Sequence, residues 1–529
     1  MSITVLAAVI GMAAGCSAPE PPELVPEATD FTETSRYDDV MEVVDYARQH
    51  ADNMHYEVFA QSEQGRDLPL LVFSDRVVSS PQQARDLSRP VVFIVANIHS
   101  GEVEGKEALL RLILELTAGE HTEWLGKVTL ALAPIYNADG NEMIDREHRT
   151  NQWGPSGGVG TRPNAEGLNL NRDFTKLDTS EGQGLVQNVL ATWDPMLFMD
   201  LHTTNGSPHG YHLTYAEPLN PNTDPMIREF MRGRMLPEIR SDMQEKGWQV
   251  FDYGNFYRGP EQGWFTYSHM PRYSSNYHGL RNRLGLLSET YAYVDYESRI
   301  DVVEDFVKET VAFMSENAVE IQAMKQVLDA NYTEHADSLE AGISFDYTQV
   351  PAEFPVLIAD LDTMRHDDLE RNTYMRMGIA DTVSSLLYNE FRATESRSIP
   401  FAYALDNRSG DYDHVVENLR MHGITTVSTS NGDPVPVRRF AAETFQQEED
   451  AYEGHRLVTV EGAFRDEEVA LDDWVIIPTN NSNRQLIFYL LEPESDDGYV
   501  KWGLFNQALE SGDSFPVVKV PSAGALNLE

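Results

Sequence analysis

Four side chains that could bind a metal ion or move a proton follow predicted strands of this 529-residue sequence. His99 and Glu102 are three residues apart in a turn between a predicted strand and a predicted helix, and His202 ends a later strand. Two histidines and one carboxylate with a fourth position left open are a common ligand set of catalytic zinc. Glu289 follows another apolar strand, where it could act as general base. Each residue singly also has an ordinary explanation, as a hydrogen-bonded histidine or a surface carboxylate.

The elements that must position these residues alternate between strands and helices. Residues 91–96 (VVFIVA) form a continuous apolar run, typical of a strand buried on both faces, and residues 108–116 have the spacing of an amphipathic helix. Other buried strands are predicted at residues 128–132, 197–201 and 284–287, and other helices near residues 37–50, 184–192, 225–245 and 299–328. This alternation predicts an α/β sheet covered by helices on both faces, with the active site at the carboxyl ends of its strands.

The character of the sequence changes after residue 331. Residues 335–529 have shorter predicted elements, many of them β-like, as at residues 356–359, 401–404, 475–478 and 486–491. This segment lacks the histidine and glutamate placements of the first part. We therefore expect a separate β-rich or mixed accessory domain at residues 335–529, built as one unit or as two small ones.

Charge and composition exclude several classes of protein. The chain has 40 Lys and Arg against 85 Asp and Glu, a formal net charge of −45, and no basic stripe, so nucleic acid is not an expected partner. With 41% hydrophobic and 10% aromatic residues it is not a disordered chain. We interpret the acidity as that of a well-solvated surface.

The first residues resemble a bacterial lipoprotein signal. An apolar run at residues 3–14, too short to span a bilayer, precedes Gly15 and Cys16, the only cysteine of the sequence. We expect a signal segment at residues 1–16, an extended tether at residues 17–34, and export from a bacterial cell to a periplasmic or outer-membrane location. A lipid on Cys16 would be the only contact with a membrane. The alternative is an ordinary cleaved signal peptide with an incidental cysteine.

Six short motifs and one glutamate follow one another in a specific order in residues 35–330. They are Gln64-Gly65-Arg66, His99-Ser100-Gly101-Glu102, residues 134–140 (PIYNADG), Arg149-Thr150-Asn151, residues 168–174 (LNLNRDF), Asp200-Leu201-His202 and Glu289. In this order they resemble the zinc carboxypeptidase family, the carboxypeptidase A-like metallopeptidases. The resemblance implies a mixed, mostly parallel sheet with helices on both faces over residues 35–330, which would form the catalytic domain.

The same resemblance implies a role for each matching residue. His99, Glu102 and His202 would bind one Zn²⁺ per chain, with Asp200 supporting them rather than binding the ion. Glu289 would be the general base, and Arg149 would stabilise the oxyanion of the tetrahedral intermediate. The substrate-binding residues would be Asn171 and Arg172, which hold a terminal carboxylate, and a mobile tyrosine. Tyr277 is favoured for the last role over Tyr267 and Tyr273, because a glycine-containing loop could move it.

The resulting hypothesis is a zinc-dependent metallocarboxypeptidase. It would hydrolyse the C-terminal peptide bond of peptides, or of peptide-like substrates with a free C-terminal carboxylate, by metal-activated water. Two related activities, a peptidoglycan-peptide hydrolase and an N-acyl amino acid deacylase, could use a similar site. A binding protein without catalysis is a further alternative, although it would have little reason to keep all four residues of the centre.

Overall fold

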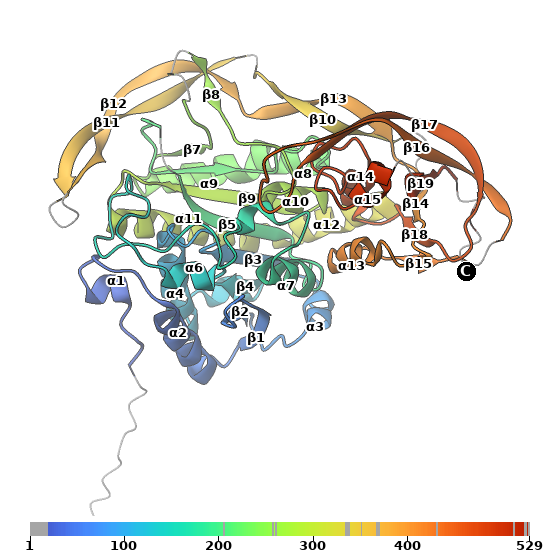
Figure 1. Cartoon of the computed structure of the whole chain (residues 1–529). Coiled ribbons are helices and arrows are strands. Elements are labelled where there is room, and N and C mark those ends of the chain that lie inside the picture. The colour runs from blue at the N-terminus through green and yellow to red at the C-terminus, as the bar shows by residue number, and fades with distance from the viewer. Residues whose placement is uncertain are drawn as a thin grey trace, which may run out of the picture.

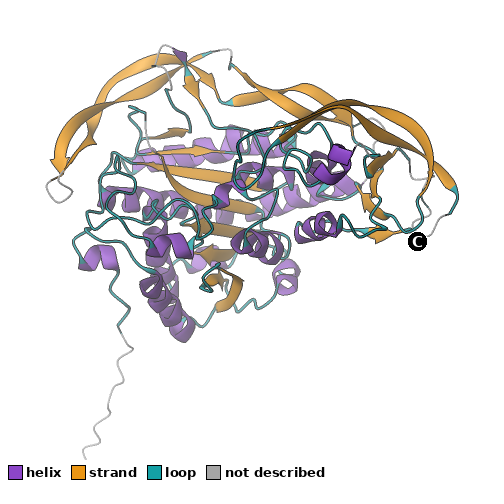
Figure 2. Ribbon diagram, viewed as in Figure 1, coloured by secondary structure: helices purple, strands orange, loops and turns teal. Residues whose placement is uncertain are grey.

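The computed structural model describes residues 20–529 except 205–206, 257–258, 260–261, 334–338, 351, 367–370, 430–431, 512–513, 523–525 and 527–529. The predicted signal segment and Cys16 lie outside the described residues. Among the helices that are described, none has the length and apolar character needed to cross a membrane. Figure 1 shows the elements in chain order, and Figure 2 shows the helices surrounding the central strands.

An eight-stranded sheet in the order β1-β2-β4-β3-β5-β9-β6-β7 is the centre of the first part, counted over the described residues. Its strands are β1 (Met54–Gln61), β2 (Asp67–Phe73), β3 (Val91–Ala96), β4 (Thr129–Ala133), β5 (Leu197–Thr204), β6 (Leu213–Ala216), β7 (Val250–Asp252) and β9 (Leu284–Tyr291). The pairs β4–β3, β3–β5, β5–β9 and β6–β7 are parallel, and the other three pairs are antiparallel. The expected mixed, mostly parallel α/β sheet is confirmed.

The two faces of this sheet can be followed in β5, whose side chains alternate in direction. Leu201 points to helix α4 (Glu104–Thr117), where a Cβ on Gly105 would come within 2.7 Å of the Leu201 Cβ. The preceding residue, Asp200, accepts a hydrogen bond from Ser274 Oγ of α10 (Ser274–Leu280) at 2.6 Å. Helices α4 and α10 therefore cover opposite faces, which explains why both β3 and β5 are buried throughout and why β3 is apolar along its whole length.

The remaining helices of the first part pack around these layers. They are α1 (Val25–Ala28), α2 (Tyr37–His50), α3 (Pro81–Asp86), α5 (Thr122–Leu125), α6 (Ala138–Glu142), α7 (Ser180–Gly184), α8 (Pro225–Phe230), α9 (Leu236–Glu245), α11 (Tyr296–Glu316) and α12 (Ala318–Thr333). The 3₁₀-helix η1 (Leu170–Arg172) and the short π-helices η2 (Leu185–Leu190) and η3 (Met231–Met235) lie between them. Helix α4 contacts both α2 and α11. The helix expected at residues 225–245 is present as α8, η3 and α9 in succession.

The C-terminal part is built from long antiparallel ribbons that arch beside the central sheet (Figure 1). Its strands are β10 (Glu340–Thr348), β11 (Glu353–His366), β12 (Arg371–Tyr388), β13 (Glu390–Ser398), β14 (Ala402–Leu405), β15 (Val427–Ser428), β16 (Pro434–Gln447), β17 (Val458–Ala470), β18 (Val475–Pro478) and β19 (Val517–Val520), with helices α13 (Asp413–Met421), α14 (Arg484–Leu491) and α15 (Asn506–Ser511). The ribbon β11–β12 joins the first part through β8 (Trp264–Phe265), which pairs with β12. The expected β-rich character is thus present.

One predicted strand of this part is wrong. Residues 486–491 lie within helix α14, and all six side chains are buried, with at most 1% exposed. A short run that is apolar on every side fits a fully buried helix as well as a strand, so periodicity alone could not separate the two.

Candidate active site

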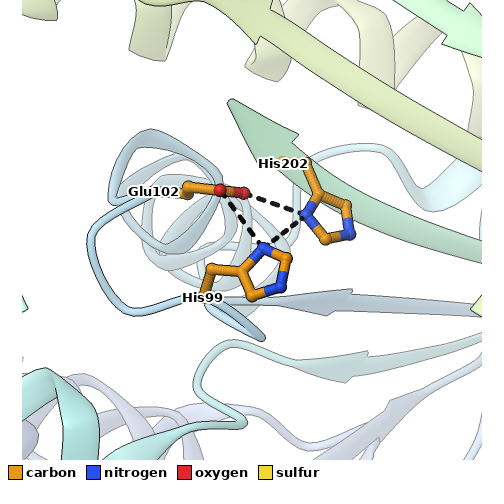
Figure 3. Close-up of side chains that lie close together, drawn as sticks. All are labelled: His99, Glu102 and His202. Carbon is orange, nitrogen blue, oxygen red and sulfur yellow. Dashed lines mark hydrogen bonds and ion pairs between the residues drawn. The ribbon is translucent and has the colours of Figure 1, made fainter. Parts of the chain in front are cut away.

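The three predicted metal ligands lie together at the carboxyl ends of β3 and β5 (Figure 3). The Nδ1 atoms of His99 and His202 are 3.2 Å apart. The Glu102 carboxylate lies 3.2 Å from His99 Nδ1 through Oε1 and 2.9 Å from His202 Nδ1 through Oε2. The side chains are only 2–3% exposed. Three donor atoms thus face one common point, an arrangement that could hold a metal ion.

Both imidazoles are held from behind by a polar partner. The Nε2 atom of His99 lies 3.0 Å from Asn169 Oδ1, and the Nε2 atom of His202 lies 2.9 Å from Asp200 Oδ2. Such partners fix the orientation of a metal-binding histidine and direct its other nitrogen to the ion. Two nitrogens and a carboxylate with this support fit zinc, which prefers N and O ligands in this number at catalytic sites.

The electrostatics of the cluster favour a cation. Burial lowers the pKa of His99 to about 4, so this imidazole is neutral at pH 7, as a ligand must be. Burial also opposes the charged form of His202, but the carboxylates of Asp200 and Glu102 outweigh it and raise the pKa of His202. The negative potential that favours a proton there would equally favour a metal cation.

The local backbone explains how His99 reaches this point. Asn97 has a φ of 65°, a left-handed conformation that asparagine tolerates, and it turns the chain sharply at the end of β3. The next loop is fixed where Ser100 Oγ donates to the Asn137 carbonyl at 2.7 Å. At Gly160 a Cβ would lie 2.5 Å from the Gly140 carbonyl oxygen and 2.7 Å from the Ser100 Cβ, so only glycine allows this close approach.

Glu289 is placed directly beside the cluster by strand register. In the parallel pair β5–β9 it is the partner of His202, and both residues line a cavity of about 620 Å³. Burial at the cavity wall raises the pKa of Glu289 to about 8, with the nearby Glu102 charge adding to the effect and His202 opposing it. A carboxylate with a raised pKa beside a metal cluster has the properties of a general base.

Arg149 is not placed where the oxyanion role would require it. Its guanidinium donates hydrogen bonds to Gln152 Oε1 at 2.6 Å, to Glu102 Oε1 at 2.8 Å and to the Thr203 carbonyl at 2.8 Å. Arg149 is absent from the described lining of the cavity. In the described structure the Arg149 guanidinium therefore contacts the predicted ligand Glu102 and does not line the cavity, where an oxyanion donor was expected.

Arg162 takes the position at the cavity that was expected for Arg149. Its Nη1 lies 3.3 Å from Glu102 Oε1 and 3.2 Å from His99 Nδ1, its side chain is 46% exposed, and it lines the cavity. Arg162 is not among the site residues predicted from the sequence. The available signal was a cation in the segment that joins the motif at residues 149–151 to the motif at residues 168–174.

Asn171 and Arg172, the two residues predicted to hold a terminal carboxylate, both line the cavity. Asn171 is held between His202 Nε2, 3.3 Å from its Nδ2, and the Ser274 backbone N–H, which donates to its Oδ1 at 3.1 Å. The Arg172 guanidinium lies 4.1 Å from the centre of the Tyr273 ring. Within the described part of the chain no carboxylate forms an ion pair with Arg172, so its charge is available to a ligand.

Tyr277 does not reach the cavity. Its ring is completely buried in α10, and its hydroxyl lies 2.8 Å from His422 Nδ1 of the C-terminal part. The expected mobile loop is helix α10, and Gly279 packs closely on Pro218, whose Cβ would lie 2.5 Å from an added Cβ. Tyr267 and Tyr273 line the cavity instead.

A mostly parallel α/β sheet with a His–Glu–His cluster and a glutamate at its carboxyl edge is the arrangement of a metal-dependent hydrolase. Residues 41–192 match the family model described as zinc carboxypeptidase. The recognition of this family from the sequence motifs is therefore confirmed, and with it the expectation of an enzyme of the metallocarboxypeptidase class.

The proteins similar to this chain include two named carboxypeptidases and one solved structure. Carboxypeptidase 2 of Trichophyton tonsurans is 22% identical over 506 residues, which cover 90% of this chain and 84% of that protein. Carboxypeptidase Z of Mus musculus is 35% identical over 127 residues, 23% of this chain and 18% of that protein. A solved metallo-carboxypeptidase from Pseudomonas aeruginosa, in complex with (2-guanidinoethylmercapto)succinic acid, aligns with 55% of this chain and 71% of its own at 19% identity and a TM-score of 0.41.

Proposed function

We propose that this chain is a zinc-dependent metallocarboxypeptidase that removes the C-terminal residue of peptides. The observation that carries the proposal is one cavity that contains a metal-type cluster, a glutamate beside it and an arginine without a carboxylate partner in the described part of the chain. A free C-terminal carboxylate is the substrate group that such an arginine would recognise, because the planar guanidinium matches it with two parallel hydrogen bonds.

His99, Glu102 and His202 would hold the zinc ion. When bound there, zinc would lower the pKa of a water molecule and polarise the scissile carbonyl. Glu289 accepts a proton from the attacking water and returns it to the leaving amine. Arg162 donates to the oxygen on which negative charge develops, and Asn171 and Arg172 hold the terminal carboxylate of the substrate.

The location of the enzyme is a second, separate part of the proposal. The sequence of residues 1–16 supports export and a lipid anchor on Cys16. Metabolic labelling with a fatty acid would test this, because the Cys16→Ser variant should lose the label while the wild-type chain carries it. If the wild-type chain carries no label, residues 1–16 are better explained as an ordinary cleaved signal peptide.

The proposed activity can be tested with protein that lacks residues 1–18. The protein is incubated with a peptide library, muropeptides and N-acyl amino acids, with and without a chelator, and the products are identified by mass spectrometry. Loss of single C-terminal residues, abolished by the chelator and restored by zinc, is the expected result. If only muropeptides or only N-acyl amino acids are cleaved, that class replaces peptides as the proposed substrate. If no pool is cleaved, the proposed activity is refuted.

A further inference from the structure

A turn from the C-terminal part reaches the substrate site. Residues 448–457 connect β16 to β17, and their tip is a tight turn in which the backbone groups of Tyr452 and His455 bond each other at 2.7 and 3.0 Å. The two residues between them, Glu453 and Gly454, have φ values of 48° and 82°, as in the two-residue turns that fit twisted hairpins. The tip is therefore an ordered two-residue hairpin turn.

Two contacts fix this tip beside the catalytic centre. Glu453 Oε2 accepts a hydrogen bond of 2.8 Å from the backbone N–H of Asn169, the residue whose side chain holds His99. His455 Nε2 lies 2.7 Å from Asp178 Oδ2. Both partners belong to the segment that follows Arg162, so the tip is docked on the loop that carries Asn171 and Arg172.

The docked tip brings the Tyr452 hydroxyl to Arg172. Arg172 Nε donates to this hydroxyl at 3.1 Å, while its Nη1 donates to the Asn171 carbonyl at 2.6 Å and the Tyr273 ring lies against its plane. Tyr452 is itself held, because its ring stacks with Trp502 at 6.2 Å between centroids and faces the Arg272 guanidinium at 5.3 Å. The buried Asp497 binds both Trp502 and Arg272.

The chemistry of Tyr452 suits a guanidinium that must bind an anion. A neutral hydroxyl fixes the plane of Arg172 through Nε, whereas a carboxylate at that position would also neutralise its charge. The Nη2 edge is left for a ligand, and bidentate recognition of a carboxylate depends on the orientation of that edge.

We propose that Tyr452 is a positioning residue for Arg172, so that the C-terminal part completes the site for the substrate carboxylate. This inference rests on the proposed function, since it takes the C-terminal carboxylate of a peptide as the ligand of Arg172. It assigns to residues 448–457 a role in substrate recognition.

The test compares binding and turnover in the full chain. Tyr452→Phe removes only the hydroxyl, and Tyr388→Phe is the matched control, because the Tyr388 hydroxyl bonds the exposed Gln349 on another ribbon. In the catalytically silent Glu289→Gln background, calorimetry measures the affinity for a short peptide and for the same peptide with a C-terminal amide. In the active background, KM and kcat are measured for the peptide.

We expect Tyr452→Phe to weaken binding of the free peptide by about threefold to tenfold, the range that corresponds to the net contribution of one typical hydrogen bond. The KM rises by a similar factor, kcat stays unchanged, and the amide form and the Tyr388→Phe control show no effect. Equal loss for peptide and amide, or a fall in kcat alone, would overturn the positioning role.

The outcome also separates this inference from the proposed function. If the wild-type chain prefers the free peptide to its amide and Tyr452→Phe leaves that preference intact, the inference fails while the carboxypeptidase stands. If the wild-type chain neither cleaves nor distinguishes the two peptides, the proposed function fails. Equal melting temperatures of the wild-type chain, Tyr452→Phe and Tyr388→Phe would show that the two variants are folded.

Discussion

Replacement of Arg162 and of Arg149 by alanine should have different consequences, although both guanidinium groups contact the Glu102 carboxylate. Arg162 lies at the cavity and would donate to the developing oxyanion. Loss of one such donor costs ~3–4 kcal/mol in the transition state, or roughly 10²–10³ in kcat. We therefore expect Arg162→Ala to keep its zinc and its melting temperature and to lose this factor in kcat.

Arg149 should instead affect the integrity of the site. Its side chain is 13% exposed and holds Glu102, which is 3% exposed. Arg162 still contacts Glu102 in the Arg149→Ala variant, so the loss is that of a hydrogen bond to a charged group, about 1.5–3 kcal/mol. Arg149→Ala should lower the melting temperature and the zinc content, while the kcat per bound zinc stays within about threefold of wild type.

The assay measures kcat and KM on one peptide at saturating zinc, zinc content by atomic absorption and the melting temperature by calorimetry. Arg85→Ala serves as the control, since Arg85 is an exposed arginine on α3. The roles assigned to the two arginines are refuted if Arg149→Ala melts like wild type with full zinc and loses about 10² in kcat. It is also refuted if Arg162→Ala leaves kcat unchanged.

Three further results are expected. Glu289→Gln should retain zinc and peptide affinity in calorimetry but abolish turnover, and substantial remaining activity would exclude Glu289 as the base. Tyr277→Phe should leave kcat and KM unchanged while lowering the free energy of unfolding by about 1 kcal/mol, because its hydroxyl bonds buried His422 away from the cavity; a raised KM would contradict this placement. The pKa of Asp194 is held below its usual range, although burial alone would raise it, because Arg283 and Lys325 stabilise the carboxylate. Its pairing therefore stabilises the fold fully above the unfolded pKa, and this contribution shrinks as the pH falls from there through the folded value. Asp194→Asn should destabilise at pH 7 and progressively less at acidic pH, and a pH-independent loss of melting temperature would refute the pairing.

The fold of the first part and the His–Glu–His cluster were accessible from the sequence because they depend on local patterns. The run VVFIVA can only be a strand buried on both faces or a buried helix segment, and the alternation around it favours the strand. His99 and Glu102 are close in sequence, and His202 and Glu289 end neighbouring parallel strands. Residues at the carboxyl ends of such strands meet at one edge, whatever the details of the loops.

The loops around this edge were decided by packing between distant segments. Arg149 and Arg162 lie in one loop region, and nothing in their spacing shows which guanidinium faces the cavity and which is taken up by Glu102 and Thr203. For the tyrosines, the glycine that favoured Tyr277 as mobile is a site of close helix packing on Pro218. The direction of a side chain depends on its backbone conformation and its tertiary neighbours, neither of which residue type reveals.

Tyr452 is the clearest case of what only the tertiary structure decided. It is 280 residues from Arg172 in sequence, in a segment without any motif of the first part. Its hydroxyl reaches Arg172 because a tight turn, a glutamate on a backbone N–H and a stack on Trp502 together dock the β16–β17 ribbon. The sequence determined which residues could do the chemistry, since that follows from their types and from strand order. The tertiary structure determined which of them face one cavity, since that depends on contacts whose partners are hundreds of residues apart.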